Sequence, residues 1–469
     1  MSTEKKRPLW PLLVAALVAV GLYAYTVVEV APDPMAGRPK GGVAEIEALA
    51  ERDDTNLLFI VIDTLRSERM SAYGYERDTT PFLAKLASTG IRFGDHIAQS
   101  SWTKSSMASM WSARTPLRVG ITRFNHTVSD AVEMPAEVLA DAGFKTVGLY
   151  RNGWVNASFG FSQGFEKYYK PLGGYNDPQV QRMRPNAQLA GTDESLMADA
   201  TEFLRIHGKS SRWFLYLHLM DVHEYTYDQE SAKFGNTVSD VYDNSILRED
   251  WVVSTLYQYL GQQGLLDKTI VVVISDHGEA FGERGFEGHA REVFPETTET
   301  PFIISLPFEL SPGIVVDART NNLDVWPTVL DLIGLPSQET GLDGRSRREA
   351  ILAVARGEEP PATEGEVSVA FLDENWGTPG GERLPAISVI DGDFRYVSGS
   401  ALNGRPYEIL LSKADGQKTN QLAQHPEVAE KMRGKAKELL AQDSAFESKE
   451  IKLDQMQLDQ LRALGYQLP

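Results

Sequence analysis

The feature that most constrains the fold is a short apolar run that ends abruptly in polar residues. Residues 270–274 read Ile-Val-Val-Val-Ile, and Ser275-Asp276-His277-Gly278-Glu279 follows directly. A continuous β-branched run of this length is typical of a strand buried on both faces, as in a parallel sheet. In open α/β sheets, ligands bind just beyond the carboxyl ends of the strands. A carboxylate beside an imidazole at this place suits a divalent metal, although a solvated Asp-His turn would give the same pattern.

Strands and helices alternate along most of the chain. Strand-like runs lie at 56–62, 91–93, 144–150, 213–219 and 301–306, and helix-like runs lie between them at 79–87, 98–111, 134–142, 193–205, 240–260 and 324–333. This alternation predicts an α/β fold with a doubly wound, mainly parallel sheet. After about Gly344 the pattern changes to short strands separated by glycine turns, at 367–372, 386–390, 394–397 and 407–411. These strands predict a small C-terminal antiparallel subdomain.

The N-terminal region differs from the rest of the chain. Lys5, Lys6 and Arg7 precede an uncharged stretch from Pro8 to Val28, whose 21 residues are enough to cross a bilayer as a helix. The basic flank favours an N-terminus on the cytoplasmic side of the membrane and the bulk of the chain on the opposite side. A cleaved signal peptide is the alternative, but this apolar stretch exceeds the usual length of such segments. We therefore expect one transmembrane helix, with the folded part on the extracytoplasmic (periplasmic) side.

The predicted organisation has five parts. Residues 1–30 form a cytoplasmic stub and anchor, 31–55 a linker rich in Pro and Gly, 56–345 the α/β domain, 346–422 the antiparallel subdomain and 423–469 a C-terminal helix and tail. The balance of 46 basic against 65 acidic residues, net −19, argues against a nucleic-acid partner. The absence of cysteine excludes disulfides, thiolate nucleophiles and Cys-ligated metals.

Three strand ends present groups that could act together. Asp63 follows the 56–62 strand, Thr103 lies after the 91–93 strand, and Asp276 with His277 ends the 270–274 strand. Two carboxylates, one hydroxyl and one imidazole could hold one divalent cation, which would lower the pKa of the Thr103 hydroxyl and make it a nucleophile. Thr103 also begins a predicted helix, whose N-terminus favours an anion. Transfer of a phosphoryl or sulfuryl group needs this combination.

Several motifs, taken in order, resemble those of sulfatases of the alkaline phosphatase superfamily. They are Asp63-Thr-Leu-Arg66, Tyr73-Gly-Tyr75, Thr79-Thr-Pro-Phe-Leu83, Ser101-Trp-Thr103, Met220-Asp-Val-His223, Ser275-Asp-His-Gly-Glu279, Glu287-Gly-His289, Leu342-Asp-Gly-Arg-Ser346 and Leu461-Arg-Ala-Leu-Gly-Tyr466. The resemblance covers about residues 56–466 and implies an alkaline-phosphatase-like fold. It also implies a metal-dependent hydrolase of an anionic ester, on a sulfated or phosphorylated glycan or lipid.

The resemblance implies a role for each matching residue. Asp63, Thr103, Asp276 and His277 are the expected metal ligands, Thr103 is the expected nucleophile, and His223 and His289 are expected to contact the transferred group or protonate the leaving oxygen. Expected substrate contacts are Lys104, His218, Arg66 and Arg291. Taken alone, His218 is more typical of a core histidine, and the two arginines are equally compatible with surface charges. Arg151, Arg182 and Arg184 are further candidates for contact with an anionic substrate.

Residue 103 departs from the sulfatase pattern. Sulfatases convert a Cys or Ser within Cys/Ser-x-Pro-x-Arg to formylglycine, whereas this chain has Thr103-Lys-Ser-Ser-Met107. Threonine cannot give that aldehyde, so no formylglycine is expected. A threonine nucleophile with one divalent ion (Mn, Ca, Mg or Zn) resembles the phosphorus-handling relatives instead. A phosphoglycerol- or phosphoethanolamine-type transferase therefore stays open beside the hydrolase, as does a catalytically degenerate binding member.

Overall fold

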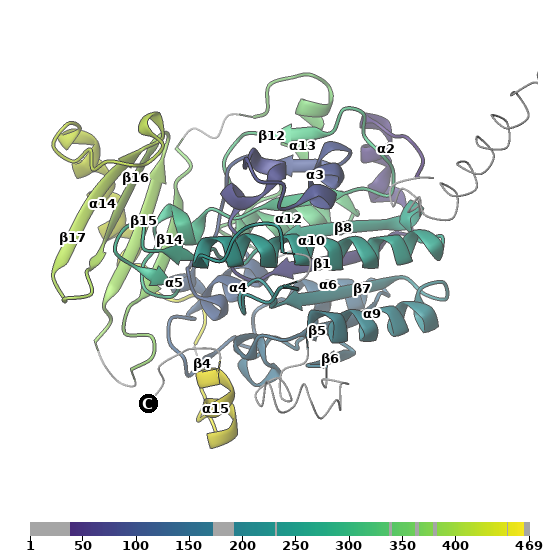
Figure 1. Ribbon diagram of the computed structural model, residues 1–469, viewed down its shortest axis with the longest axis horizontal. Coiled ribbons are helices and arrows are strands. Elements are labelled where there is room, and N and C mark those ends of the chain that lie inside the picture. The colour runs from purple at the N-terminus through teal and green to yellow at the C-terminus, as the bar shows by residue number, and fades with distance from the viewer. Residues whose placement is uncertain are drawn as a thin grey trace, which may run out of the picture. The chain divides into compact units, whose positions relative to one another are not determined.

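The computed structural model describes residues 38–171, 192–229, 232–336, 340–361, 365–378, 382–447 and 449–463. Its centre is an eight-stranded sheet (Figure 1). In spatial order the strands are β12 (Ile314–Val316), β2 (Ile91–Phe93), β11 (Phe302–Ser305), β8 (Thr269–Ile274), β1 (Asn56–Ile62), β7 (Trp213–Leu219), β5 (Lys145–Tyr150) and β6 (Lys167–Tyr169). The predicted mainly parallel sheet is confirmed.

The register of the central strands brings their carboxyl ends together. β1 runs parallel to both β7 and β8, with Ile62 opposite Leu219 and Val61 opposite Ile274. β1, β7 and β8 are buried along their whole length. The residues that follow these strands therefore meet at one edge of the sheet.

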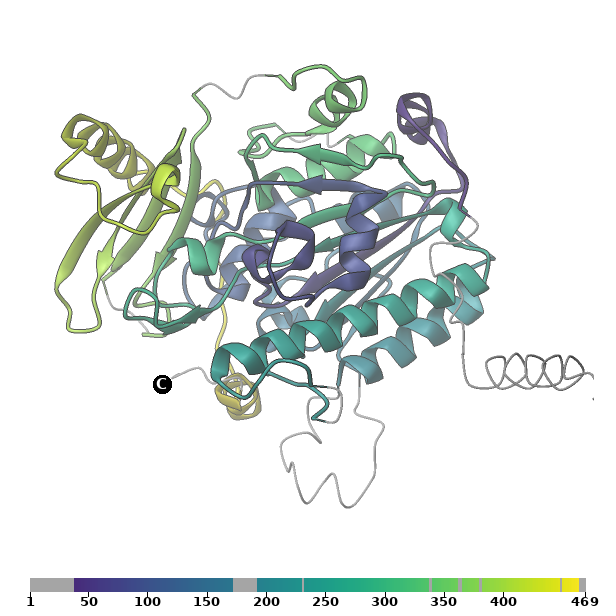
Figure 2. The ribbon, with the colours of Figure 1, turned by 45° about the horizontal axis from the view of Figure 1, so that its top comes forward.

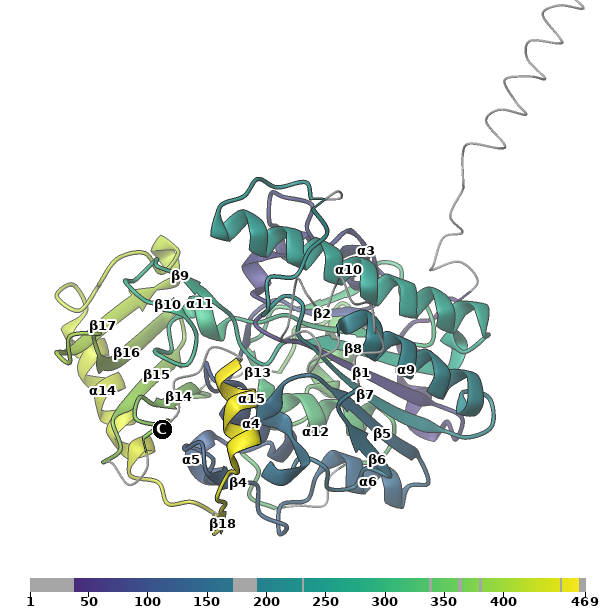
Figure 3. The ribbon, with the colours of Figure 1, turned by 60° about the horizontal axis from the view of Figure 1, so that its bottom comes forward.

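Helices cover both faces of the sheet. Figure 3 shows α3 (Pro81–Ser88), α9 (Asp193–His207) and α10 (Val238–Gln262) on one face, and α4 (Thr103–Ser112), α6 (Pro135–Asp141) and α12 (Asn322–Leu332) on the other. Aromatic rings join the second layer to the sheet: Phe59 of β1 stacks on Trp326 of α12 at 4.6 Å between centroids, and Trp326 stacks on Trp111 of α4 at 5.1 Å. This packing fixes α4, and with it Thr103, against the strand that precedes Asp63.

The four predicted C-terminal strands form a separate antiparallel sheet, as expected (Figure 1). Its strands are β14 (Ser368–Asp373), β15 (Pro385–Asp391), β16 (Phe394–Ser400) and β17 (Pro406–Ser412), and α14 (Pro426–Leu440) packs on it. The tail then returns to the central domain. There β18 (Lys449–Glu450) pairs with β4 (His126–Thr127), and α15 (Gln455–Ala463) lies beside Gly153–Val155.

Shorter elements complete the described fold. They are α2 (Val43–Ala48), α5 (Pro116–Val119), α11 (Pro295–Thr298) and α13 (Arg348–Ala355), and the strand pairs β3 (His96–Ile97) with β13 (Thr320–Asn321) and β9 (Ala280–Phe281) with β10 (Glu287–Gly288). α13 packs against β12 of the central sheet rather than against the antiparallel strands.

Two features differ from the sequence-based expectations. The end of the predicted linker is folded, because Ile46 of α2 and the adjacent Leu49 are fully buried in the main core. β11 runs antiparallel to both its neighbours β8 and β2, which its short apolar run could not reveal. The predicted anchor at 8–28 lies outside the described residues, and none of the helices that are described has the length and apolar character to cross a bilayer.

Candidate active site

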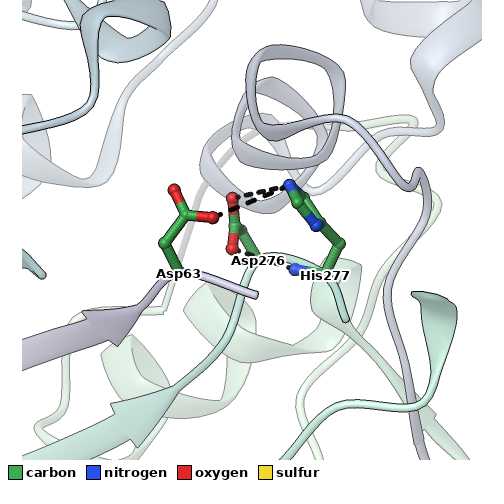
Figure 4. A group of neighbouring side chains, drawn as sticks. All are labelled: Asp63, Asp276 and His277. Carbon is green, nitrogen blue, oxygen red and sulfur yellow. Dashed lines mark hydrogen bonds and ion pairs between the residues drawn. The ribbon is translucent and has the colours of Figure 1, made fainter. Parts of the chain in front are cut away.

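Asp63, Asp276 and His277 converge at the carboxyl ends of β1 and β8. Figure 4 shows the two carboxylates and the imidazole turned toward one another. His277 Nε2 lies 3.8 Å from Asp63 Oδ1 and 3.4 Å from Asp276 Oδ2, and all three side chains are fully buried. Each offers a ligand atom within 4.8 Å of the other two. These are the three residues that the sequence grouped as metal ligands.

The atoms that face this centre are available for a cation. Asp63 Oδ1 and Asp276 Oδ2 accept no hydrogen bond from the part of the chain that the structure describes. His277 Nδ1 lies 3.0 Å from the Gly278 carbonyl oxygen, which can only accept, so Nδ1 carries the proton. In the neutral ring the Nε2 lone pair then points into the centre. Buried carboxylate oxygens without partners are costly unless paired, so this donor set fits a divalent metal.

The two carboxylates affect each other's ionisation. Burial alone would raise the pKa of Asp63, but the imidazoles of His223, His218 and His277 outweigh it and hold that pKa well below its usual range. Burial and the neighbouring Asp63 carboxylate raise the pKa of Asp276. Two carboxylates this close repel each other when both are ionised, and a divalent ion between them would remove the repulsion.

Thr103 lies beside this centre at the first position of α4. Its Oγ1 is 3.1 Å from His277 Nε2, and the side chain is fully buried. All ten residues of α4 are buried, so the helix N-terminus and its free N–H groups lie in a low-dielectric environment. The structure therefore brings the predicted nucleophile and the predicted metal ligands together at a place that also favours an anion.

Asn152 is a site residue that the sequence did not reveal. It follows β5, and its Nδ2 donates to Asp63 Oδ2 at 2.6 Å and to Thr103 Oγ1 at 3.1 Å. Its Oδ1 accepts from the Trp154 backbone N–H at 2.8 Å, which fixes the orientation of the amide. An Asn after a strand is a common turn residue, so only the position of β5 beside β7 could have identified it.

His218 stands behind Asp63. Its Nε2 donates to Asp63 Oδ2 at 3.0 Å, since a carboxylate can only accept, and its Nδ1 is 2.7 Å from the Tyr216 hydroxyl. Both ring nitrogens are therefore engaged inside the protein. Oδ2 of Asp63 is held by Asn152 and His218, which leaves Oδ1 facing the centre.

Two further histidines line the approach to the centre. The ring centroid of His289 lies 4.7 Å from that of His277 and 4.9 Å from that of His223. His289 Nδ1 donates to Glu279 Oε1 at 3.1 Å. Burial alone would lower the pKa of His289, but the Glu279 carboxylate has the larger effect and raises that pKa. Burial lowers the pKa of His223 to about 4, so this ring is neutral. The Asp-His-Gly-Glu motif thus supplies Glu279, a partner for His289 that the sequence-based list of site residues lacked.

Two of the other predicted substrate contacts, Lys104 and Arg66, bond within the protein. Lys104 is fully buried. Its Nζ donates to the Phe124 carbonyl at 2.7 Å and lies 3.6 Å from the Phe159 ring centroid. Burial lowers the pKa of Lys104 well below the usual value. Arg66 is buried and donates to the Glu279 carbonyl at 2.8 Å and to Glu283 at 2.7 Å, so it supports the loop after β8. Arg291 is exposed. Arg182 and Arg184 lie outside the described residues.

Backbone strain accompanies two of the site residues. Thr64, directly after Asp63, has φ of 61°, and Ala290, directly after His289, has φ of 57°. Non-glycine residues rarely adopt this left-handed region, and such strain is often found at functional sites. The Thr64 conformation turns its N–H toward Asp276 Oδ1, at 3.4 Å, so the strain serves the pairing of the two carboxylates.

Comparison with known proteins identifies the class to which this fold and site belong. The family model described as Sulfatase matches residues 55–335, and the chain belongs to this family. Membership makes it an enzyme of the sulfuric or phosphoric ester hydrolase class. Arylsulfatase A of Homo sapiens is 26% identical over 357 residues, which cover 66% of this chain and 70% of the human protein. Phosphoethanolamine transferase EptA of Helicobacter pylori is 23% identical over 293 residues, 57% of this chain and 51% of that protein.

Solved structures share the fold. A structure of Ps i-CgsB in complex with k-i-k-neocarrahexaose superposes with a TM-score of 0.65 at 17% identity, covering 88% of this chain and 98% of that one. Phosphonate monoester hydrolase SpPMH from Silicibacter pomeroyi superposes with a TM-score of 0.62 at 18% identity, covering 82% and 94%. The predicted alkaline-phosphatase-like fold is confirmed.

Proposed function

We propose that this protein is a metal-dependent hydrolase of a sulfate or phosphate ester, with Thr103 as its nucleophile. The observation that supports this most is that Asp63 Oδ1 and Asp276 Oδ2, which accept no hydrogen bond within the described chain, converge with His277 Nε2 beside the Thr103 hydroxyl. A divalent ion held by these four groups would lower the pKa of the hydroxyl and offset charge on the transferred group.

Thr103 and His289 act in the first step. The Thr103 alkoxide attacks phosphorus or sulfur, the bond to the leaving oxygen breaks, and the group becomes bonded to Oγ1. Protonated His289 donates its proton to the leaving oxygen, which departs as an alcohol. Glu279, 3.1 Å from His289 Nδ1, stabilises the charged imidazole that this role requires.

The second step releases the group and restores the enzyme. Neutral His289 accepts a proton from an incoming water molecule, whose oxygen attacks phosphorus or sulfur as the bond to Thr103 Oγ1 breaks. Neutral His223 has two ring nitrogens without hydrogen-bond partners in the described chain, so its N–H can donate to an oxygen of the transferred group. Asn152 and the N-terminus of α4 hold Thr103 and the anion in place.

Assay of the purified protein tests this function directly. We expect divalent-metal-dependent turnover of at least one of 4-nitrophenyl sulfate, 4-nitrophenyl phosphate and bis(4-nitrophenyl) phosphate. Thr103→Ala should reduce kcat roughly 10³-fold or more, because it removes the nucleophile. Ser105→Ala is the matched control, since Ser105 is also buried in α4 but donates to the Ile121 carbonyl away from the centre. Unchanged turnover in Thr103→Ala would exclude this nucleophile, and no turnover in any variant would favour a degenerate binding protein.

A transferase is the second candidate, and the similarity to EptA favours it. The same Thr103 intermediate would pass its group to a hydroxyl of an envelope glycan or lipid instead of water. Product analysis with added glycerol or ethanolamine distinguishes the two. Free sulfate or phosphate supports hydrolysis, whereas a glycerol or ethanolamine adduct that dominates at millimolar acceptor supports transfer.

Two wider aspects belong to this proposal. One solved neighbour is in complex with its substrate D-glucosamine-2-N,6-O-disulfate and another is a 2-O GAG sulfatase, which supports an anionic ester on a sugar or lipid as the natural substrate. The apolar stretch 8–28 supports membrane anchoring with the active site on the periplasmic side. Fractionation of cells that express an N-terminally tagged chain tests this, and recovery of an untagged soluble form would contradict it.

A further inference from the structure

A buried network of charged residues lies next to the candidate active site, and the proposed mechanism gives it no role. Its members lie on β5, β7, α9 and α10 or directly after these strands: Arg151, Asp193, Asp221, Glu224, Arg248 and Glu249. All except Glu224 and Arg248 are nearly or fully buried. Burial of an ionic network costs desolvation free energy unless every charged group has a well-placed partner. A network of this kind beside the candidate site therefore indicates a role there.

Arg151 is the centre of this network. Its Nη1 donates to Asp193 Oδ1 at 2.8 Å and to Asp221 Oδ1 at 2.6 Å, and its Nη2 donates to Glu224. The sequence suggested that Arg151 contacts a substrate anion. Arg151 is only 3% exposed, however, and its guanidinium binds carboxylates within the protein. The guanidinium also supplies, between these carboxylates, the positive charge that a bound cation would otherwise supply.

Asp193 joins Arg151 to the turn that carries His223. Its carboxylate accepts from the backbone N–H of Met220 at 2.8 Å and of Asp221 at 2.6 Å. Asp193 is the first residue of α9, and Figure 2 shows α9 and α10 side by side. From α10, Glu249 has a carboxylate oxygen within 4.8 Å of those of Asp193 and Asp221. Burial and the Asp193 carboxylate raise the pKa of Glu249 well above its usual value.

Two members of the network are close in sequence to residues of the candidate site. Arg151 is adjacent in sequence to Asn152, which contacts Asp63 and Thr103. Asp221 lies two residues before His223, which lines the same centre. A shift of Arg151 would therefore move Asn152 and the His223 turn together, and distances within a site need to hold to a fraction of an ångström.

We propose that Arg151 and Asp193 are positioning residues, which hold Asn152 against Asp63 and Thr103 and hold the His223 turn in place. This inference deepens the proposed function and depends on it for its catalytic consequence. Its consequence for metal binding is independent, because Asn152 donates directly to Asp63, a predicted metal ligand.

The test is a double-mutant cycle of Arg151→Lys with Asn152→Ala. Lysine keeps the buried charge but cannot reproduce the two-armed donation of the guanidinium. We expect each single variant to lower kcat and Mn²⁺ affinity by about 10- to 100-fold, with KM changed little, and the double variant to be little worse than either single variant. Arg38→Lys is the matched control, because Arg38 is also buried but bonds to Ser305 and Leu306 near the start of β8, away from the site.

The outcomes separate this inference from the proposed function. If Asn152→Ala costs the same factor in the wild-type and Arg151→Lys backgrounds, Arg151 does not act through Asn152 and the inference is wrong. The same conclusion follows if Arg38→Lys lowers kcat and Mn²⁺ affinity as much as Arg151→Lys does. If the wild type hydrolyses no ester, the proposed function fails, while the cycle in Mn²⁺ affinity still tests the positioning role. If Arg151→Lys does not fold, Asp193→Asn, which keeps the side-chain shape, takes its place in the same cycle.

Discussion

Exchange of His218 for alanine should weaken metal binding rather than substrate binding. His218 donates to Asp63 Oδ2 at 3.0 Å and is held by the Tyr216 hydroxyl at 2.7 Å, with no exposed surface on either ring. The chain Tyr216–His218–Asp63 orients the carboxylate so that its Oδ1 faces the centre. A carboxylate that hydrogen-bonds to a metal-ligating histidine fixes the orientation of that ring. An imidazole that donates to a metal-ligating carboxylate fixes the orientation of the carboxylate in the same way.

The magnitude follows from the bonds that are lost. His218→Ala removes a hydrogen bond to a charged group, about 1.5–3 kcal/mol, and leaves the buried Tyr216 hydroxyl without a partner, about 1–3 kcal/mol more. We therefore expect the free energy of unfolding to fall by about 2.5–6 kcal/mol. Divalent-metal affinity should fall about 10- to 100-fold. Tyr216→Phe removes only the hydroxyl and should weaken metal binding by about tenfold at most, since every 1.4 kcal/mol is tenfold.

Calorimetric Mn²⁺ titration, thermal unfolding and steady-state kinetics at saturating metal together provide the test. His126→Ala is the control, because His126 is half-buried and bonds to the Gly120 carbonyl away from the centre. The order of metal affinity should be wild type, Tyr216→Phe, then His218→Ala. A raised KM in His218→Ala with unchanged Mn²⁺ affinity would refute this reasoning and return His218 to the substrate-contact role that the sequence suggested.

Two other predictions concern the proton donor and the metal. Glu279→Gln should move the alkaline limb of the pH profile of kcat/KM to lower pH. The Glu279 carboxylate raises the pKa of His289, so without it the proton needed by the leaving oxygen is lost at lower pH. An unmoved limb would exclude His289 as the proton donor. Metal analysis should find about one tightly bound divalent ion in the wild type and none in Asp276→Ala, because Asp276 supplies one of the two free carboxylate oxygens. Two ions in the wild type would contradict the one-metal prediction.

The sequence predicted those parts of the fold whose signal is local. β1 and β8 are buried along their whole length, so each reads as an apolar run that a polar residue follows directly. The same logic identified Asp63, Asp276 and His277, because parallel strands end at one edge of the sheet. The direction of a strand within the sheet cannot be read from its own residues. An apolar run such as β11 has the same composition whether it pairs parallel or antiparallel with its neighbours.

The parts of the site that the sequence missed depend on partners far apart in the chain. Asn152 contacts Asp63 only because β5 lies next to β7, and β7 lies next to β1. Arg151 and His218 looked like groups for an anion, yet their partners are carboxylates 42 and 155 residues away. A basic or imidazole side chain gives no sequence signal of whether it faces a substrate or a buried acid.

In the proposed mechanism, threonine at position 103 determines how the covalent intermediate can be released. An ester on Oγ1 has no second hydroxyl on the same carbon, so elimination cannot free the group, and the bond from phosphorus or sulfur to Oγ1 must be broken by a second oxygen nucleophile. That nucleophile approaches from the side where the first alcohol left, which is the side of His289 in the proposed mechanism. Hydrolysis and transfer therefore use Asp63, Thr103 and Asp276 identically and differ only in which oxygen reaches His289. For this reason the motifs that contain the predicted metal ligands resemble those of hydrolases and transferases alike. In this mechanism the surface that admits the acceptor decides between the two reactions.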